Sequence, residues 1–383
     1  MILRKAILKV GLLICSLSML SGCDGNRVTV TSSPFTTIAV AVRSGEQNKM
    51  QKIVDRFSEE NPSIKIKFIE LGRDFEQYRL ISAALSTEEY LFDIVEVEDV
   101  WVDDLVKREY ITPVNNSVGE LNEYLPFVQD SFRRGENVYA LPLQIDIGML
   151  LALKKYNWDG EFSSITDMPD NADVRIYDDS GEETICSIME LIKYTDNNVN
   201  EALRLYRDIY FHESGGSRHV EEFREGQIPI MRALSSVIPS LRNDSSKVLG
   251  DYYIFNTPES STGKETSTAK IFGLAVSSLS RHKEMCGKFL EYCGRDSTQT
   301  TLIKSTGMYP VKQSLYSNPI ITSEWTHILP MEERINNINI RPHIEGYAEA
   351  SGNLQKIISG YLSGSVSEQE AADCARSFVG NME

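Results

Sequence analysis

The stretch that decides the fold is TIAVAV, residues 37–42, taken together with the passage that follows it. This short and almost wholly apolar run predicts a buried strand. The next passage, EQNKMQKIVDRFSEENP at residues 46–62, places its apolar side chains on one helical face, at Met50, Ile53, Val54 and Phe57. A helix is therefore predicted here, and it ends before Pro62 because proline disfavours helical geometry in the residue that precedes it.

The alternation of strand and helix continues along the next part of the chain. Residues 63–71, SIKIKFIEL, alternate apolar with charged side chains, which is the period of a half-buried strand. Residues 75–85 have a helical pattern, and residues 91–98, LFDIVEVE, predict a further strand. Strands that alternate with helices are joined by right-handed crossovers in a largely parallel sheet, so the sequence predicts an α/β fold.

The rest of the chain is less regular but contains both kinds of element. Residues 137–156 have the pattern of a strand, with Pro142 inside it. Amphipathic patterns predict further helices at residues 201–211, 220–226, 346–362 and 367–379. A chain of 383 residues is long enough to form two lobes, each with a core of its own.

Composition and charge exclude some classes of function. The chain is 41% hydrophobic and 25% charged, which is ordinary for a globular protein. Its formal net charge of −16 repels nucleic acid and anionic lipid surfaces. We therefore expect no nucleic-acid partner.

Motifs for a cofactor, a metal or catalysis are not met. Residues 258–266, PESSTGKET, lack the first glycine and the hydroxyl residue of a phosphate-binding loop. Residues 212–219, HESGGSRH, have the wrong spacing for a zinc helix, and residues 177–184, YDDSGEET, misplace the glycine of a calcium loop. We expect no cofactor, no metal and no catalysis. A glycosidase would need two carboxylates facing one another across a cleft, which a sequence cannot show.

Four cysteines lie beyond the N-terminal segment. Cys286 and Cys293 fall in one predicted helix, where their Cα atoms would lie about 10 Å apart along the axis. That separation is too long for a disulfide. For Cys186 and Cys374 the sequence leaves both possibilities open, a partner or a free thiol.

The N-terminus has the pattern of an exported protein. A basic start precedes an apolar run at residues 10–22, which is shorter than the about 20 residues of a membrane-spanning helix. The run ends in LSGC, residues 20–23, which resembles the lipobox of bacterial lipoproteins. The alternative is an ordinary secretory signal beside a cysteine. The resemblance implies a signal peptide at residues 1–22, lipid attachment at Cys23, a tether at residues 23–35, and a lipid-anchored protein on the extracytoplasmic side of the cell membrane.

Several segments, taken in order, resemble the extracellular solute-binding proteins that deliver ligands to ATP-binding cassette (ABC) importers, in the branch that includes sugar binders. No single segment is specific, and the resemblance depends on their order. The segments are IVDRFSEENPSIKIKF (53–68), FDIVEVEDVWVDDLVKREYITPV (92–114), ENVYALPLQIDIGMLLALKKY (136–156), FREGQIPIMR (223–232), GLAVSSLSRHKEMCGKFLEYC (273–293), STGMYPVKQSLYSNP (305–319) and RPHIEGYAEASGNLQKIISGYLSG (341–364).

The resemblance implies a two-lobed α/β fold, the periplasmic-binding-protein-like fold of type II, with a ligand cleft between the lobes. Closure on the ligand would then be a hinge motion. The expected divisions are an N-lobe at residues 36–142 plus 270–320 and a C-lobe at residues 143–269 plus 321–383, with chain crossings near Pro142, Thr268–Ile271 and Ser317–Ser323.

The resemblance also implies which side chains contact the ligand. Glu98 or Asp99, at the end of a strand, would accept paired hydrogen bonds from adjacent sugar hydroxyls. Trp101 offers an apolar face to a sugar ring, with burial in the lobe core as the equal alternative. The other candidates are the polar pair Gln144 and Asp146, the forked donors Arg232 and Arg341, an aromatic wall at Tyr347 and, at the start of the first helix, Glu46.

The sequence departs from related disaccharide binders at two positions where those proteins carry aromatic side chains. After Arg232 it has ALSS, residues 233–236, and before the strand FGLAV it has TAKI, residues 268–271. The ligand would then be smaller, more weakly bound, or not a sugar. Carbohydrate is the ligand class that we predict first. Other ligands stay open, because a fold does not fix its ligand.

The sequence therefore predicts a monomeric, lipid-anchored binding protein without catalysis. It would capture a small molecule, first of all a carbohydrate, and deliver it to the permease subunits of an ABC importer. Two alternatives stay open: a sensor subunit that presents its ligand to a membrane kinase, with the same two lobes, and an extracellular lipoprotein hydrolase.

Overall fold

The computed structural model describes residues 35–156, 176–177, 181–211 and 219–380, which belong to one unit, Phe35–Glu383. The predicted signal peptide, Cys23 and almost all of the predicted tether lie outside these residues. In the described part of the chain, no helix is both long and apolar enough to cross a membrane.

The first five elements are those that the sequence predicted. They are β1 (Thr36–Arg43), α2 (Glu46–Glu60), β2 (Ile64–Leu71), α3 (Asp74–Ser86) and β3 (Ile94–Glu98). β1 pairs in parallel with β2 on one side and with β3 on the other. The helix α2 buries Met50, Ile53, Val54 and Phe57, as its periodicity predicted. The α/β alternation is therefore confirmed in this part of the chain.

The middle of the sheet is antiparallel. β12 (Thr268–Ser277) runs antiparallel to β3, and β7 (Ala140–Leu153) runs antiparallel to β12. The prediction of a largely parallel sheet is therefore right for β1, β2 and β3 and wrong for β12 and β7, whereas short strands further along the chain pair in parallel again. The reason is topological, because β7 carries the chain out of this half of the sheet and β12 brings it back.

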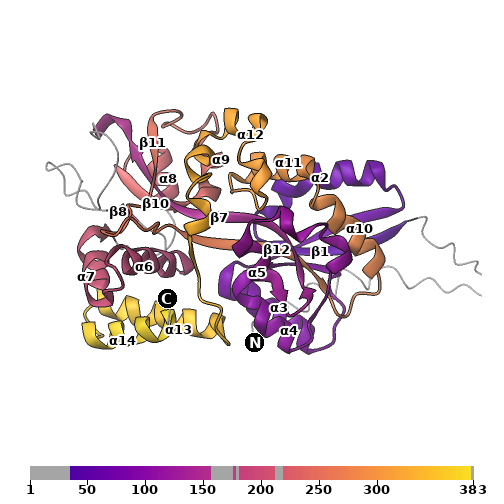
Figure 1. Cartoon of the computed structure of the whole chain (residues 1–383), viewed down its shortest axis with the longest axis horizontal. Helices are drawn as coiled ribbons and strands as arrows, with labels where there is room; N and C mark the ends of the chain where they lie inside the picture. The colour runs from indigo at the N-terminus through magenta and orange to yellow at the C-terminus, as the bar shows by residue number, and fades with distance from the viewer. Residues whose placement is uncertain (1–34, 157–175, 178–180, 212–218, 381–383) are drawn as a thin grey trace, which may run out of the picture. The chain divides into compact units, whose positions relative to one another are not determined.

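β7 is buried along its whole length and belongs to both halves of the sheet (Figure 1). Its residues Ala140–Ile147 pair with β12, and Gly148–Leu153 pair with β10 (Ile230–Leu234) and β11 (Tyr252–Asn256). The change of partners thus lies beyond Pro142, near which the sequence placed the crossing. Pro142 lies at an irregularity in the β7–β12 register, where the N–H that proline lacks is not needed.

We call the half with β1, β2, β3 and the start of β7 the first lobe. The second lobe contains β10 and β11, and four helices that pack on one another: α6 (Glu182–Tyr194), α7 (Val199–Ile209), α13 (Tyr347–Leu362) and α14 (Glu368–Val379). Figure 1 shows these helices as a group below β10. Between β12 and α13, the two-residue strand β13 (Asn339–Ile340) pairs with the start of β12 and leads directly to Arg341.

The remaining elements complete the lobes. They are α4 (Val102–Lys107), β4 (Ile111–Thr112), α5 (Pro126–Phe132), the β5–β6 hairpin (Arg133–Arg134 and Asn137–Val138), β8 (Ile176–Tyr177), β9 (Tyr210–Phe211), α8 (His219–Arg224), α9 (Ile238–Leu241), α10 (Lys283–Cys293), α11 (Asp296–Thr306) and α12 (Pro319–Glu324). Cys286 and Cys293 both lie in α10, as predicted, and the four cysteines of the described residues are free thiols.

Candidate ligand-binding site

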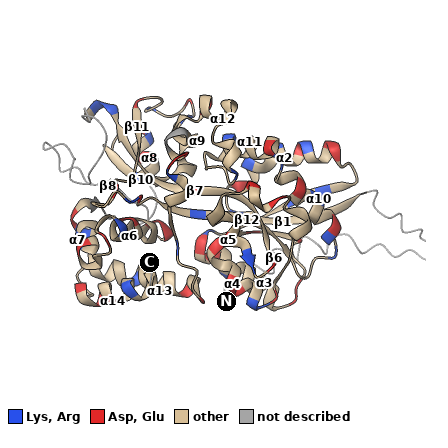
Figure 2. Cartoon of the chain, in the orientation of Figure 1, with Lys and Arg blue, Asp and Glu red and all other residues tan. Residues whose placement is uncertain are grey.

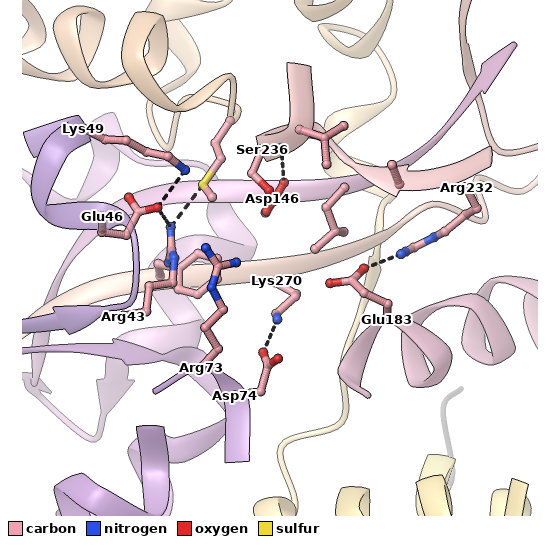
Figure 3. A pocket seen from close by; sticks show the side chains of 15 residues that line it. Arg43, Glu46, Lys49, Arg73, Asp74, Asp146, Glu183, Arg232, Ser236 and Lys270 are labelled. Atoms are coloured by element: carbon pink, nitrogen blue, oxygen red, sulfur yellow. Dashed lines mark hydrogen bonds and ion pairs between the residues drawn. The ribbon is translucent and has the colours of Figure 1, made fainter. Parts of the chain in front are cut away.

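A pocket lies between the two lobes, beside β7 and β12, and holds about 640 Å³ of empty space, with the solvent at its mouth included (Figure 3). Its lining comes from both lobes and from the strands that join them. The lining residues are Arg43, Glu46, Lys49, Arg73 and Asp74 from the first lobe, Asp146, Lys270 and Phe272 from β7 and β12, Glu183, Arg232, Ala233, Leu234, Ser236 and Val237 from the second lobe, and Met308.

Three helices begin at this pocket, and each begins with acidic residues. α2 starts at Glu46, α3 starts at Asp74, and α6 starts with Glu182 and Glu183. None of these three helix starts has a side-chain hydrogen-bond cap. Carboxylates suit the positive end of the helix dipole. The sequence thus brings acidic side chains from both lobes to the same space, and Figure 2 shows acidic residues at the start of α6 close to a basic residue on β12.

Arg43, the last residue of β1, is buried between two carboxylates. Its Nη1 lies 2.9 Å from Glu96 Oε1, and its Nη2 lies 3.1 Å from Glu46 Oε1, to which Lys49 Nζ also donates at 2.9 Å. The guanidinium carbon lies 3.7 Å from the ring centroid of Phe272. One face of the Phe272 ring is therefore covered. Burial raises the pKa of Glu96 to about 7, against the opposing effect of Arg43.

Arg232, on β10, is held by two carboxylates of α6. Its Nη2 donates to Glu190 Oε1 at 2.8 Å, and its Nη1 donates to Glu183 Oε2 at 2.5 Å. Glu190 Oε1 also accepts the backbone N–H of Thr268 at 3.1 Å, which links α6 to the start of β12. Burial raises the pKa of Glu183 to about 8, although Arg232 opposes this shift.

Lys270, on β12, lines the pocket between the two lobes. Its Nζ lies 2.5 Å from Asp74 Oδ1 and 3.7 Å from Glu98 Oε1. Glu98 also pairs with Arg341, whose Nη1 lies 2.7 Å from Glu98 Oε2. The lining cation Lys270 is therefore connected to a second and deeper set of ion pairs.

Arg341 is the centre of that deeper set and is only 1% exposed. Besides Glu98, it pairs with Asp99 Oδ1 at 2.9 Å and with Glu182 Oε1 at 3.1 Å. Glu182 also accepts hydrogen bonds from the hydroxyl of Tyr347 and, at 2.6 Å, from Ser351. Burial would raise the pKa of Asp99, but Arg341 and a hydrogen bond from His343 hold it below its ordinary value. Arg341 thus joins the end of β3 to the start of α6.

Asp146 lies on β7, opposite Lys270 in the strand register, and its side chain faces the pocket. Its Oδ1 accepts hydrogen bonds from the Ser235 hydroxyl at 2.7 Å and from the Ser236 backbone N–H at 2.9 Å. This carboxylate therefore holds the short turn that follows β10.

Comparison with known proteins decides the family. Residues 52–328 match the family described as bacterial extracellular solute-binding proteins. The chain belongs to this family. The resemblance that the sequence showed is thus confirmed, and the pocket lies in a solute-binding protein.

Solved structures of other solute-binding proteins share the fold. Maltose-bound MalE3 of T. maritima gives a TM-score of 0.78 at 16% identity, over 89% of this chain and 98% of that one. The GacH receptor of Streptomyces glaucescens, solved unliganded and with acarbose, gives 0.75 at 18% identity, over 91% and 99%. A solute-binding protein of Agrobacterium vitis S4 with bound D-mannitol gives 0.73 at 16% identity, over 90% and 97%. The predicted two-lobed α/β fold is confirmed.

The predicted site residues of this solute-binding protein fall into three groups. Glu46, Asp146 and Arg232 line the pocket. Glu98, Trp101 and Tyr347 line a smaller adjacent hollow of about 210 Å³, which shares Asp74 with the pocket. The others, Asp99, Gln144 and Arg341, are buried and line neither space. Contact between the ligand and any of these residues stays a prediction.

Trp101 and Gln144 are both buried in the structure. Trp101 is 3% exposed and its ring centroid lies 5.8 Å from that of Tyr78, as in a lobe core. Gln144 is 1% exposed, and neither its amide oxygen nor its amide nitrogen has a hydrogen-bond partner among the described residues. Gln144 lies opposite Phe272 in the register of β7 and β12.

Sequence reasoning missed several lining residues of the solute-binding protein, namely Arg43, Lys49, Arg73, Asp74, Glu183, Lys270 and Phe272. A signal for the first was available. Arg43 directly follows the predicted strand TIAVAV and is the last residue of β1, and ligands of open α/β sheets bind outside the carboxyl ends of strands. Lys270 lies in TAKI and Ala233, Leu234 and Ser236 lie in ALSS, so both departures from the disaccharide binders face the pocket.

The raised pKa of Glu183 leads to a prediction about pH. The folded protein holds this proton up to about pH 8, whereas the unfolded chain releases it near pH 4.5. The group therefore stabilises the fold fully below the unfolded pKa, and stability falls as the pH rises toward 8. One proton corresponds to at most about 1.4 kcal/mol per pH unit. We expect less, because the Glu183 side chain is 20% exposed.

This prediction can be checked by measuring the free energy of unfolding between about pH 6 and pH 8 for the native chain and for Glu183→Gln. The variant should lose less stability over this interval than the native chain. Glu96 contributes a slope of the same sign and is unchanged in the variant. Equal slopes in the two proteins would show that Glu183 is ionised in the folded state.

Proposed function

We propose that this protein is a lipid-anchored, extracytoplasmic solute-binding protein that captures a small polar ligand between its lobes and delivers it to an ABC importer. The observation that carries the proposal is the pocket itself. It lies between the two lobes, and charged side chains from three helix starts and two connecting strands line it. Ligand sites of this kind hold a few well-placed polar groups in a concave space.

Carbohydrate is the ligand class that we propose, with related polyols included. Carboxylate and guanidinium groups accept and donate several hydrogen bonds at once, which suits adjacent hydroxyls. The similar structures were solved with maltose, acarbose or D-mannitol. Among the described residues that line the pocket, Phe272 is the one aromatic side chain, and Arg43 already covers one face of its ring. We therefore propose a ligand of the size of a monosaccharide, held by hydrogen bonds rather than by stacking.

Binding without catalysis is the function that the ion pairs favour. Glu46 and Asp74 are each paired with a lining cation, and although burial opposes this, the cations hold the pKa of both carboxyls below its ordinary value, so neither keeps a proton to transfer near neutral pH. A sensor subunit for a membrane kinase would have the same pocket. A pull-down from membranes distinguishes the two, because importer subunits or a kinase would be recovered with the protein.

Ligand capture is tested by a thermal-shift screen of the mature chain against sugars, polyols, amino acids, polyamines and metals. A ligand present at 100 times its dissociation constant adds about 2.7 kcal/mol to the apparent stability. A sugar or polyol that raises the melting temperature supports the proposal. Stabilisation by a metal alone would contradict it, and the described residues contain no group of His, Cys, Asp or Glu suited to a metal ion.

Replacing Asp146 tests whether the pocket is the binding site. Asp146→Ala should weaken ligand binding by about 1.5–3 kcal/mol, the usual size for a hydrogen bond to a charged group. Stability should fall by about 1 kcal/mol, because the hydrogen bonds from Ser235 and Ser236 are lost as well. Ser235→Ala is the matched control, since it removes one of these bonds and keeps the carboxylate. Unchanged affinity in Asp146→Ala, with a lowered melting temperature, would assign Asp146 to the turn alone.

Anchoring is tested at Cys23, which lies outside the described residues. We expect the native protein to partition into detergent, and Cys23→Ala to stay uncleaved or to be released from the membrane. The readouts are the mass of the N-terminus and the distribution between detergent and water. Native protein recovered without lipid in the soluble fraction would contradict the anchor and leave ligand capture untouched.

A further inference from the structure

Carboxylates outnumber cations around the pocket. Each of three buried cations is held by two carboxylates: Arg43 by Glu46 and Glu96, Arg232 by Glu183 and Glu190, and Lys270 by Asp74 and Glu98. The deeper Arg341 is shared by Glu98, Asp99 and Glu182. Each of these four buried cations therefore already has at least two carboxyl partners within the protein.

Asp146, in contrast, forms no ion pair with a cation among the described residues. Its side chain lines the pocket and is 2% exposed. Its Oδ1 accepts two hydrogen bonds from a serine hydroxyl and a backbone N–H, both neutral donors. No ion pair joins Asp146 to a lysine, arginine or histidine among the residues that the structure describes, and its Oδ2 accepts no hydrogen bond from them. Arg43 attracts Asp146 from a longer distance, without an ion pair, and a buried carboxylate without an ion pair is costly unless a ligand supplies one.

A second carboxylate oxygen of the pocket is also unused. Glu46 is 1% exposed, and its Oε1 forms ion pairs with both Arg43 and Lys49. Its Oε2 is buried and has no hydrogen-bond partner among the described residues. In Figure 3, Glu46 and Asp146 come from the first lobe and from β7, and their carboxylates lie at different points of the same wall. Glu46 and Asp146 thus each have one carboxylate oxygen without a hydrogen-bond partner among the described residues.

The lining cations at the mouth do not change this balance. Arg73 has no ion pair with a described carboxylate, but it is exposed to solvent and donates to the Ser44 carbonyl at 2.8 Å. Lys49 is 25% exposed and already paired with Glu46. Exposed charges are screened by water and salt, whereas Asp146 is removed from both. Asp146 is therefore the buried carboxylate of the pocket lining that has no ion pair among the described residues.

We propose that the ligand carries an ammonium group, and that this group pairs with Asp146. The inference rests on the proposed function, since it concerns the same pocket, and it narrows the substrate class to small hydroxylated amines such as amino sugars or amino alditols. The ammonium group supplies the ion-pair partner that Asp146 lacks among the described residues, and the hydroxyls of the ligand form hydrogen bonds with the charged side chains that line the pocket.

The test is calorimetric titration of the mature chain near pH 7 with four probes: glucosamine, glucose, glucuronate and spermidine. Glucosamine and glucose share one ring and differ in the amine, and glucuronate reverses the charge. We expect glucosamine to bind at least about tenfold more tightly than glucose, which equals 1.4 kcal/mol, with glucuronate the weakest of the three. Asp146→Asn keeps the shape and should remove the preference for glucosamine. Asp55→Asn removes the same formal charge from the exposed face of α2 and should leave the preference unchanged.

Each outcome decides one question. Glucose or glucuronate binding as tightly as glucosamine to the native chain would overturn the ammonium inference and leave carbohydrate capture standing. Spermidine binding that depends on Asp146, with no sugar bound, would support the ammonium site and overturn carbohydrate as the ligand class. If neither amine binds with a dissociation constant below about 1 mM, the inference is wrong. The comparison on the native chain stands even if Asp146→Asn fails to fold.

Discussion

Replacing Arg341 by methionine should lower the free energy of unfolding by about 3–5 kcal/mol. The guanidinium is buried and pairs with Glu98, Asp99 and Glu182, three carboxylates that are themselves buried. Methionine fills much of the same volume, so the loss comes from the charges rather than from a cavity. Three carboxylates without a cation must then take up protons or water, and both are unfavourable inside the interface between the lobes.

The measurement is urea unfolding of both proteins at the same pH, with stabilities compared from the transition midpoints. Arg376→Met is the matched control, because Arg376 lies on the surface of α14 and its ion pair with Asp373 is largely exposed. That substitution should change stability by less than about 1 kcal/mol. Adding Asp99→Asn to Arg341→Met should recover part of the loss. A loss no larger than that of the control would show that the three carboxylates do not depend on Arg341.

Arg341 also shows how much of the site could be predicted from the sequence. The sequence predicted Glu98 or Asp99, together with Arg341, as contacts of one ligand, and that contact stays a prediction. Their partners were not found. Asp99 and Arg341 are 242 residues apart in the chain, and nothing in a local pattern says that they pair with each other. The sequence predicted them as partners of a ligand, whereas in the structure they are partners of one another.

The fold, too, was predicted where a local pattern decides it and was missed where segments far apart in the chain pair. β1, α2 and β2 were predicted almost to their ends, because β1 is a continuous apolar run and α2 and β2 each have a local period in their apolar residues. The antiparallel pairing of β3 was not predicted, because it joins β3 to β12, a segment far away in the chain. The sequence placed a chain crossing near Pro142, and within β7 the change of partners falls between Ile147 and Gly148. A uniformly apolar strand gives no sign of where its partners change.

That change of partners leads to the second large effect. Gly148→Ala should lower the free energy of unfolding by about 2–4 kcal/mol. Gly148 is the first residue of β7 to pair with β10, and a Cβ added there would lie 2.1 Å from Glu190 Oε1 and 2.6 Å from Arg232 Nη2. The methyl group can be accommodated only if the Glu190 carboxylate moves. Glu190 would then lose its bonds to Arg232 and to the Thr268 N–H, both of which are buried.

The control is Gly352→Ala, at a helical position in α13 where an added Cβ meets no atom within 4 Å. That change should stabilise the protein by up to about 1 kcal/mol, because alanine favours a helix more than glycine does. Gly148→Ala combined with Glu190→Asp, which withdraws the carboxylate by one methylene, should recover part of the loss. Because Arg232 lines the pocket, Gly148→Ala should also weaken ligand binding, whereas Gly352→Ala should not. Native stability in Gly148→Ala would mean that the Glu190–Arg232 pair can shift freely, and that Glu190 does not fix α6 against β10.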